Sequence, residues 1–425
     1  MAPAQPAGLG FSPLDDELGL LPGCLTPRLQ EALVRLSTHI PSFAKASREL
    51  AWFTGAQVHT DTVRRRTEAA GAVLVAYETV EAERILHEHP DPPCTPDTLL
   101  LSVDGAMVPL VGGQWTEVRT LAVGEVQPAR QTRDGPVVET TKLSYFSRRA
   151  ESTTFGVQAT GELHRRGIEG ARRVGAVVDG AAWCQTFVDG HYPEAVRILD
   201  FPHAAAHVMG IVAYAAAVGV QIPAETRAAA GVTLPPEDPA TWRHTLHRVG
   251  PTAILPGLRA IVAARPDDPE VAAHLTYLEA RVDQMQYPCF RAEGWPIGSG
   301  MVESANKLVV EDRLKGAGMH WADAHVNPML ALRNAVCNDR WDECWTMIER
   351  EHRRDLVVKR QQRRTDRRAA SPPSVPPTGV TPPAPRPAEP AVALPPATTV
   401  PEAKPTHPWR KPWSVRRQRE LAGAS

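Results

Sequence analysis

The chain has 425 residues, a length that predicts two or three domains. Hydrophobic residues make up 43% and charged residues 22%, so most of the chain can bury a core. The 47 Lys and Arg balance 48 Asp and Glu, which excludes a uniformly basic surface for nucleic acid and leaves only local clusters for phosphate contact. No secretory pattern, membrane-spanning apolar run or CxxC pair occurs, so we expect a cytoplasmic protein without membrane contact, zinc or disulfide framework.

We expect an N-terminal arm of residues 1–25. Helical periodicity then runs to Gly71. Thr26 followed by Pro27 predicts the start of a helix. Gly55 and Gly71 predict the ends of the next two helices. We therefore expect three helices in this part of the chain.

Three consecutive arginines lie on the last of these helices, at Arg64, Arg65 and Arg66. Two short helices around a Gly-containing turn are typical of a helix-turn-helix, in which such cations would contact DNA. A plain helical hairpin is the alternative. We assign residues 26–95 to a helical DNA-binding domain.

Strand periodicity begins at Thr98. We expect three strands in an antiparallel meander, at residues 98–105, 115–126 and 137–147, then a helix at 151–167. A buried strand at 173–180, a short helix and a last strand at 195–200 follow. This order predicts an α/β fold with a mixed sheet.

The remainder of the chain lacks a strand signal. Residues 204–291 predict an all-helical insertion, followed by a helix from Met301 to about Leu314 and further helix to about Arg364. Residues 366–425 predict a disordered, proline-rich basic tail, because 15 of the 41 prolines lie between residues 371 and 412. The basic run before it is either a solvated helix or a sequence-independent contact with phosphates.

Three carboxylates stand at chemically suggestive places. Asp104 and Asp179 each end an apolar strand and precede a glycine, and active groups of α/β folds gather at such strand ends. Glu303 lies in the first turn of a helix that follows GSG, where the helix dipole favours a negative charge. Taken singly, the two aspartates could be turn residues and the glutamate a surface residue.

Hard oxygen ligands without a Cys or His cluster suit Mg²⁺ or Mn²⁺. Three converging carboxylates could hold two such ions about 4 Å apart, an arrangement that serves in-line phosphoryl displacement. The residue types therefore suggest a two-metal site.

Four segments of the chain resemble the transposases of insertion sequences of the Kra group, which belong to the Mutator-like DDE transposases. These segments are LLLSVDGAMVPL, AVVDGAAW, YPEAVRILDFPHAAAHV and PIGSGMVESANKLVVEDRLKGAGMHW. The resemblance implies a ribonuclease-H-like core in two parts, residues 96–203 and 292–365, interrupted by the helical insertion. It also implies that Asp104, Asp179 and Glu303 are the catalytic, metal-binding triad.

The resemblance further places a D-x-x-H motif at Asp200 and His203, in a supporting role, with a helix cap or a structural hydrogen bond as the alternative. Because Asp200 also ends a strand, it is an alternative to Asp179 as the second acid. In a transposase, Lys307, Arg313 and Lys315 on the Glu303 helix would contact DNA phosphates, with an ordinary solvated helix face as the alternative.

The expected function is transposition of an insertion sequence by Mg²⁺-dependent DNA cleavage and strand transfer. The partners would be the terminal inverted repeats, target DNA and at least one further copy of the chain, which places the protein at the nucleoid. A nuclease without strand transfer and a domesticated, non-catalytic DNA-binding protein are the alternatives.

Overall fold

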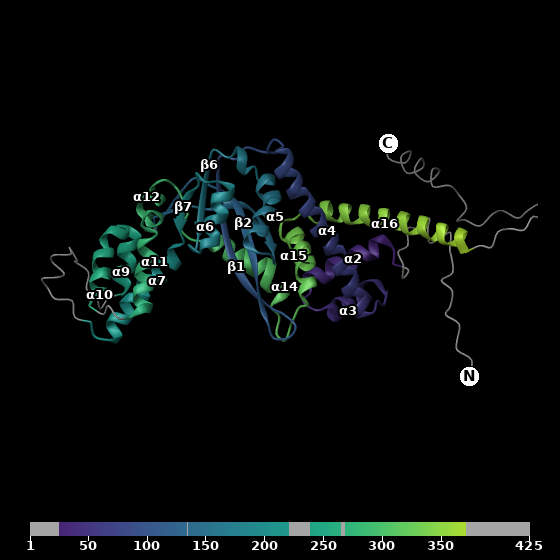
Figure 1. Ribbon diagram of the computed structural model, residues 1–425, viewed down its shortest axis with the longest axis horizontal. Helices are drawn as coiled ribbons and strands as arrows, with labels where there is room; N and C mark the ends of the chain where they lie inside the picture. Colours follow the sequence, from purple (N-terminus) through teal and green to yellow (C-terminus); the bar gives the residue numbers. More distant parts are fainter. Residues whose placement is uncertain (1–24, 134, 221–238, 265–267, 371–425) are drawn as a thin grey trace, which may run out of the picture. The chain divides into compact units, whose positions relative to one another are not determined.

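The computed structural model describes residues 25–133, 135–220, 239–264 and 268–370 (Figure 1). The predicted N-terminal arm and nearly all of the predicted proline-rich tail lie outside these residues. No helix in the described ranges is both long enough and apolar enough to cross a membrane.

The centre of the fold is a five-stranded mixed sheet. Its strands are β1 (Thr98–Pro109), β2 (Trp115–Val126), β5 (Thr140–Arg148), β6 (Arg173–Val178) and β7 (Val196–Leu199). They lie in the order β5-β2-β1-β6-β7, with antiparallel pairs on the β5 side and parallel pairs on the β7 side. The predicted meander, mixed sheet and element order are confirmed. A short hairpin, β3 (Arg130–Thr132) and β4 (Gly135–Val137), was not predicted.

Alternation of side chains along β1 divides the core into two layers. Leu99, Leu101 and Val103 pack with α5 (Ser152–Arg165) and α6 (Ala182–His191), and Leu100 and Val108 face the opposite core. The even-numbered residues of β1 therefore share the face toward the C-terminal helices.

The N-terminal helices are α2 (Pro27–His39), α3 (Phe43–Thr54) and α4 (Thr60–Glu88). Thr26 caps α2, and Gly55 ends α3 in the left-handed conformation, as predicted. These helices share a hydrophobic core with α15 (Asp323–Cys337) and α16 (Trp341–Ala370), in which Leu33 and Leu74 meet Leu332 and Trp341.

The predicted end of a helix at Gly71 is wrong, since α4 continues for 17 residues beyond it, to Glu88. Gly71 is buried at a close crossing of two helices, where an added Cβ would overlap the backbone carbonyl of Pro328 in α15. The glycine thus serves helix packing, which the sequence alone cannot distinguish from helix termination.

Replacing Gly71 by alanine is expected to destabilise the fold by about 1–3 kcal/mol, because α4 and α15 must move apart. The matched control is Gly161→Ala in α5, where an added Cβ meets nothing within 4 Å. There the better helix propensity of alanine should stabilise by up to about 1 kcal/mol. Thermal unfolding of both variants checks the opposite signs; equal stabilisation would contradict the close crossing.

The described part of residues 204–291 contains helices and no strand, as predicted. The helices of this insertion are α7 (Phe201–Ala217), α9 (Pro239–Arg248), α10 (Leu255–Ala263), α11 (Pro269–Glu279) and α12 (Tyr287–Ala292), with the 3₁₀ turns η2 (Pro251–Ala253) and η3 (Val282–Met285). Figure 1 shows them gathered beside β7, the strand that η3 contacts.

The helix predicted from Met301 to Leu314 is not regular. It consists of α13 (Gly300–Ala305), the π-helix η4 (Asn306–Glu311) and α14 (Asp312–Leu314). Each added residue in a π-turn shifts the helical phase by about 100°, so residues after η4 face other directions than an α-helix predicts.

The long final helix also departs from the prediction. Its continuation to Ala370 makes the first five residues of the predicted disordered tail, 366–370, helical. The chain divides into two units at Gln362, and all the elements described above except the end of α16 belong to the first.

Candidate active site

Asp104 and Asp179 stand at matching positions on neighbouring parallel strands. The register pairs Leu101 of β1 with Ala176 of β6, and each aspartate follows its strand partner by three residues. Asp104 lies inside β1 and not at its end, which differs from the sequence prediction, but it lies beyond the residues that pair with β6. By alternation both side chains belong to the face that carries α13.

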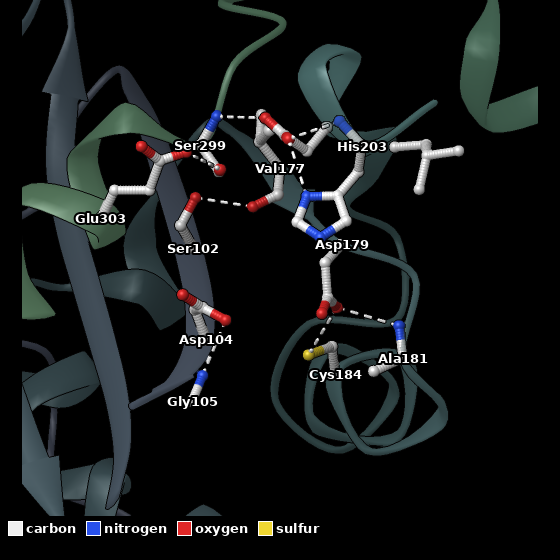
Figure 2. A network of polar contacts seen from close by, with 12 residues as sticks. Ser102, Asp104, Gly105, Val177, Asp179, Ala181, Cys184, His203, Ser299 and Glu303 are labelled. Atoms are coloured by element: carbon white, nitrogen blue, oxygen red, sulfur yellow. Dashed lines mark hydrogen bonds and ion pairs between the residues drawn. The ribbon is translucent and has the colours of Figure 1, made fainter. Parts of the chain in front are cut away.

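Both oxygens of Asp104 accept a hydrogen bond. The backbone N–H of Gly105 donates to Oδ1 over 2.7 Å, and Asn306 Nδ2 donates to Oδ2 over 2.9 Å. Burial raises the pKa of Asp104, and the negative charges of Asp179 and Glu303 raise it further, against the lowering effect of Gly105 and of His203. Figure 2 shows Asp104 with Asp179 and Glu303 around it.

Asp179 begins the turn that follows β6. Its Oδ1 accepts the backbone N–H of Ala181 over 2.9 Å and lies 3.3 Å from Cys184 Sγ. No described residue donates to its Oδ2. Figure 2 shows Asp104 and Glu303 across from Asp179 and His203.

Glu303 lies in the first turn of α13, as the sequence predicts. Its side chain is exposed, and Ser299 Oγ donates to Oε1 over 3.3 Å. Among the described residues, no Lys or Arg forms an ion pair with Glu303, Asp104 or Asp179. Three neighbouring carboxylates without cationic partners form an electrostatic environment that favours bound cations.

Asp200 occupies a different environment, because it is fully buried and saturated with donors. Its Oδ1 accepts the backbone N–H of Ser299 over 2.6 Å, and its Oδ2 accepts the N–H and Nδ1 of His203 over 3.0 and 3.1 Å. Burial would raise its pKa, but these hydrogen bonds outweigh it and keep the pKa below its usual value. Asp200 thus caps α7 and fixes the loop that leads to Glu303.

His203 is the other half of this pair. The hydrogen bond to Asp200 raises its pKa, with further contributions from the charges of Asp179 and Asp104 and an opposing effect of burial. His203 therefore lies beside the acidic cluster, and the contact predicted between it and Asp200 is present.

Asn306 is a site residue that sequence analysis missed. It is buried, its Nδ2 bonds Asp104, and its Oδ1 has no hydrogen-bond partner. The spacing of three residues from Glu303, which puts both on one side of the helix, was the signal that could have identified it.

Replacing Asn306 by aspartate is expected to place a second carboxylate against Asp104 and to destabilise the protein by about 1–3 kcal/mol at pH 8. Both carboxyls then have raised pKa values in the folded state. The loss of folding stability should therefore grow as the pH rises above the unfolded pKa near 4, and should disappear in acid. Melting temperatures at pH 5 and 8 test this, with Ser304→Asp, an exposed position on the same helix, as the control. A deficit that does not depend on pH would contradict the facing pair.

Two of the three consecutive arginines predicted to contact DNA form ion pairs within the protein. Arg64 pairs with Asp61 and Glu68, and Arg65, whose side chain is 65% exposed, pairs with Asp61. Arg66 is about half-buried, and burial lowers its pKa. Arg65 is thus the most accessible cation of the three.

Arg313 does not face solvent. It is 1% exposed, its Nε donates to the backbone oxygen of Ser37 over 2.9 Å, and its guanidinium lies 4.9 Å from the ring of Phe43. Burial lowers its pKa to about 10. In this structure the prediction that Arg313 meets a phosphate is therefore wrong, because Arg313 points inward and joins α14 to the N-terminal helices.

The two lysines predicted to accompany Arg313 do remain outside. Lys307 is exposed on the π-helix, and Lys315 pairs with Glu311 over 2.7 Å. The contact of both residues with DNA stays a prediction.

In the ranges that the structure describes, no three His, Cys, Asp or Glu side chains are arranged to hold a metal ion. The donor set nevertheless fits Mg²⁺ or Mn²⁺ in chemistry: Asp104 and Asp179 are half-buried, hard oxygen donors without cationic partners, and Glu303 acts on Asp104 electrostatically.

Comparison of the chain with protein-family models and with curated proteins found no match.

Proposed function

We propose that this chain is a DDE transposase of an insertion sequence, which cleaves DNA and joins the new end to target DNA. The observation that carries the proposal is the equal position of Asp104 and Asp179 on adjacent parallel strands, with Glu303 supplied to the same site by a later helix. Acids at such strand positions are a recurrent basis for active sites of α/β proteins.

The sheet supports assignment of a ribonuclease-H-like core, which we include in the proposal. Three antiparallel strands are followed by two parallel ones, and the acid-bearing helix returns after the helical insertion. This is the arrangement that the resemblance to Kra-group transposases implies.

Asp104, Asp179 and Glu303 would hold two Mg²⁺ ions, with Mn²⁺ as a possible substitute. When bound, such ions lower the pKa of a coordinated water and stabilise the attacking and leaving oxygens of an in-line displacement. The three side chains act as fixed negative charges, and Asp200 and Asn306 hold two elements of the site in place. The 3′-hydroxyl released by cleavage would then be the nucleophile toward target DNA.

DNA binding would involve both ends of the described chain. Helices α3 and α4 would serve as the helix-turn-helix that reads the terminal inverted repeats, with Arg65 as its most exposed cation among Arg64–Arg66. The arginine-rich second half of α16 would add contacts that do not depend on sequence. Joining two element ends requires at least two copies of the chain on DNA.

The test is a strand-transfer reaction with labelled DNA fragments taken from both sides of the gene, an unlabelled target plasmid and Mg²⁺. Products in which the labelled 3′ end is joined to the target support the proposal. Nicked fragments without joined products would indicate a nuclease, and shifted but uncut fragments would indicate a DNA-binding protein without catalysis. Binding and cleavage both absent would contradict the proposal in every form.

A further inference from the structure

Two side chains of the insertion hold the backbone of the turn that carries Asp179. The hydroxyl of Tyr277 donates to the backbone oxygen of Asp179. Arg281 donates from Nη2 to the backbone oxygen of Gly180 over 2.6 Å and from Nη1 to the backbone oxygen of Tyr277 over 2.9 Å. Two consecutive carbonyls of the turn are thus satisfied by one helix end that lies about 100 residues away in the chain.

The turn and the helix end approach so closely that only glycine fits at position 180. Gly180 has φ of +82°, and an added Cβ would lie 2.5 Å from Arg281 Nε and 2.6 Å from the hydroxyl oxygen of Tyr277. The guanidinium carbon of Arg281 lies 3.9 Å from the Tyr277 ring centroid, which keeps the two side chains together.

The contact continues along the helix that follows the turn. The side-chain amides of Gln284 in η3 and Gln185 in α6 form two hydrogen bonds with each other, of 3.2 and 3.4 Å. Tyr277 lies in the last turn of α11, Arg281 just after this helix and Gln284 in η3, so one short segment reaches Asp179, Gly180 and α6.

A histidine of α7 supports Tyr277 from its other face. The rings of His207 and Tyr277 stack at 3.8 Å with planes 6° apart. Burial, with the charges of His274, His203 and Arg281, lowers the pKa of His207 to about 4, so the ring is neutral near pH 7 and does not repel Arg281. The tyrosine is therefore fixed on both sides.

We propose that the insertion positions the second acid: Tyr277 and Arg281 are positioning residues that hold Asp179 opposite Asp104, and the insertion thereby controls assembly of the metal site. This inference rests on the proposed function for its consequence, but the contact itself does not. The carboxylate of Asp179 follows the turn closely, because its Oδ1 is bound to Ala181 and Cys184 within the same segment. Release of the two carbonyls would let the whole turn move.

The experiment uses the full chain with Tyr277→Phe and Arg281→Met. The control is Tyr287→Phe, which removes another insertion hydroxyl that donates to a backbone oxygen, that of Leu199 over 3.0 Å. Hydrogen–deuterium exchange of residues 179–188 should become about five- to tenfold faster in the two test variants and stay unchanged in the control. Mn²⁺ binding, measured by calorimetry without DNA, should weaken about 10- to 100-fold in the test variants only.

Exchange in residues 179–188 that equals the wild type, or that rises equally in Tyr287→Phe, would overturn the proposal. So would unchanged Mn²⁺ affinity in a test variant whose exchange is faster. If the wild type neither binds Mn²⁺ nor cleaves DNA, the proposed function fails, and the exchange comparison alone then decides whether the insertion holds the turn.

Discussion

Asp104→Asn is expected to lower DNA cleavage by at least about a thousandfold while end binding stays unchanged. The substitution removes one negative charge from the carboxylate cluster that would hold the ions. It preserves the local contacts: the new amide oxygen can accept from Gly105, and Asn306, whose Oδ1 is buried without a partner, can rotate its amide and accept from the new N–H. The expected loss is therefore chemical and not structural.

Stability provides a second readout for the same variant. Burial and the neighbouring acids raise the pKa of Asp104. A carboxyl with a raised folded-state pKa destabilises the fold above that pKa, so Asp104→Asn should melt at or above the wild-type temperature at pH 7 without metal. Mg²⁺ should raise the melting temperature of the wild type and not that of the variant.

Asp179→Asn and Glu303→Gln should show the same loss of cleavage with retained DNA binding. The control is Asp97→Asn, just before β1, whose exposed carboxylate pairs with Arg172 and should leave cleavage unchanged. Cleavage by Asp104→Asn within tenfold of the wild type would exclude this carboxylate as a ligand of the reacting metal ions.

The mixed sheet, the turn after β6 that begins with Asp179 and the position of Glu303 in the first turn of a helix could be predicted because their signals are local. Apolar runs followed by Asp-Gly identify buried strands and the turns after them, as for Asp179. The sequence placed Asp104 at a strand end, although β1 continues past it to Pro109, because an Asp-Gly pair inside a strand has the same local pattern as a turn.

Contacts between distant segments could not be predicted in this way. Gly71 resembles a helix end because its role depends on Pro328, which is more than 250 residues away. The hydrogen bonds from Tyr277 and Arg281 to the Asp179 turn likewise leave no local pattern in the sequence. The burial of Arg313 also escaped detection, because its partners Ser37 and Phe43 lie in the N-terminal helices, about 270 residues away.

Asp200→Asn is expected to differ from Asp179→Asn in stability: it should lose about 3–5 kcal/mol of folding free energy, and cleavage should be lost as a consequence. Both oxygens of Asp200 accept from N–H groups, so an amide NH₂ in either place faces a donor in a fully buried site. The released partner is Ser299, which leads into the helix of Glu303. Asp179→Asn, by contrast, should lose cleavage and keep its melting temperature.

Asp268→Asn is the matched control, because Asp268 also caps an insertion helix, at the N-terminus of α11, but is only partly buried. Asparagine caps helices as well as aspartate does, so this variant should melt like the wild type. Folding lowers the pKa of Asp200, so its carboxylate stabilises the fold above the unfolded pKa near 4. This stabilisation is lost as the pH falls through the lower folded pKa. The difference in stability between Asp200→Asn and the wild type should therefore shrink in acid. If Asp200→Asn melts normally but fails to cleave, while Asp179→Asn cleaves, the second metal-binding acid is Asp200 and not Asp179. The contacts of Tyr277 and Arg281 with the Asp179 turn would then have no catalytic consequence.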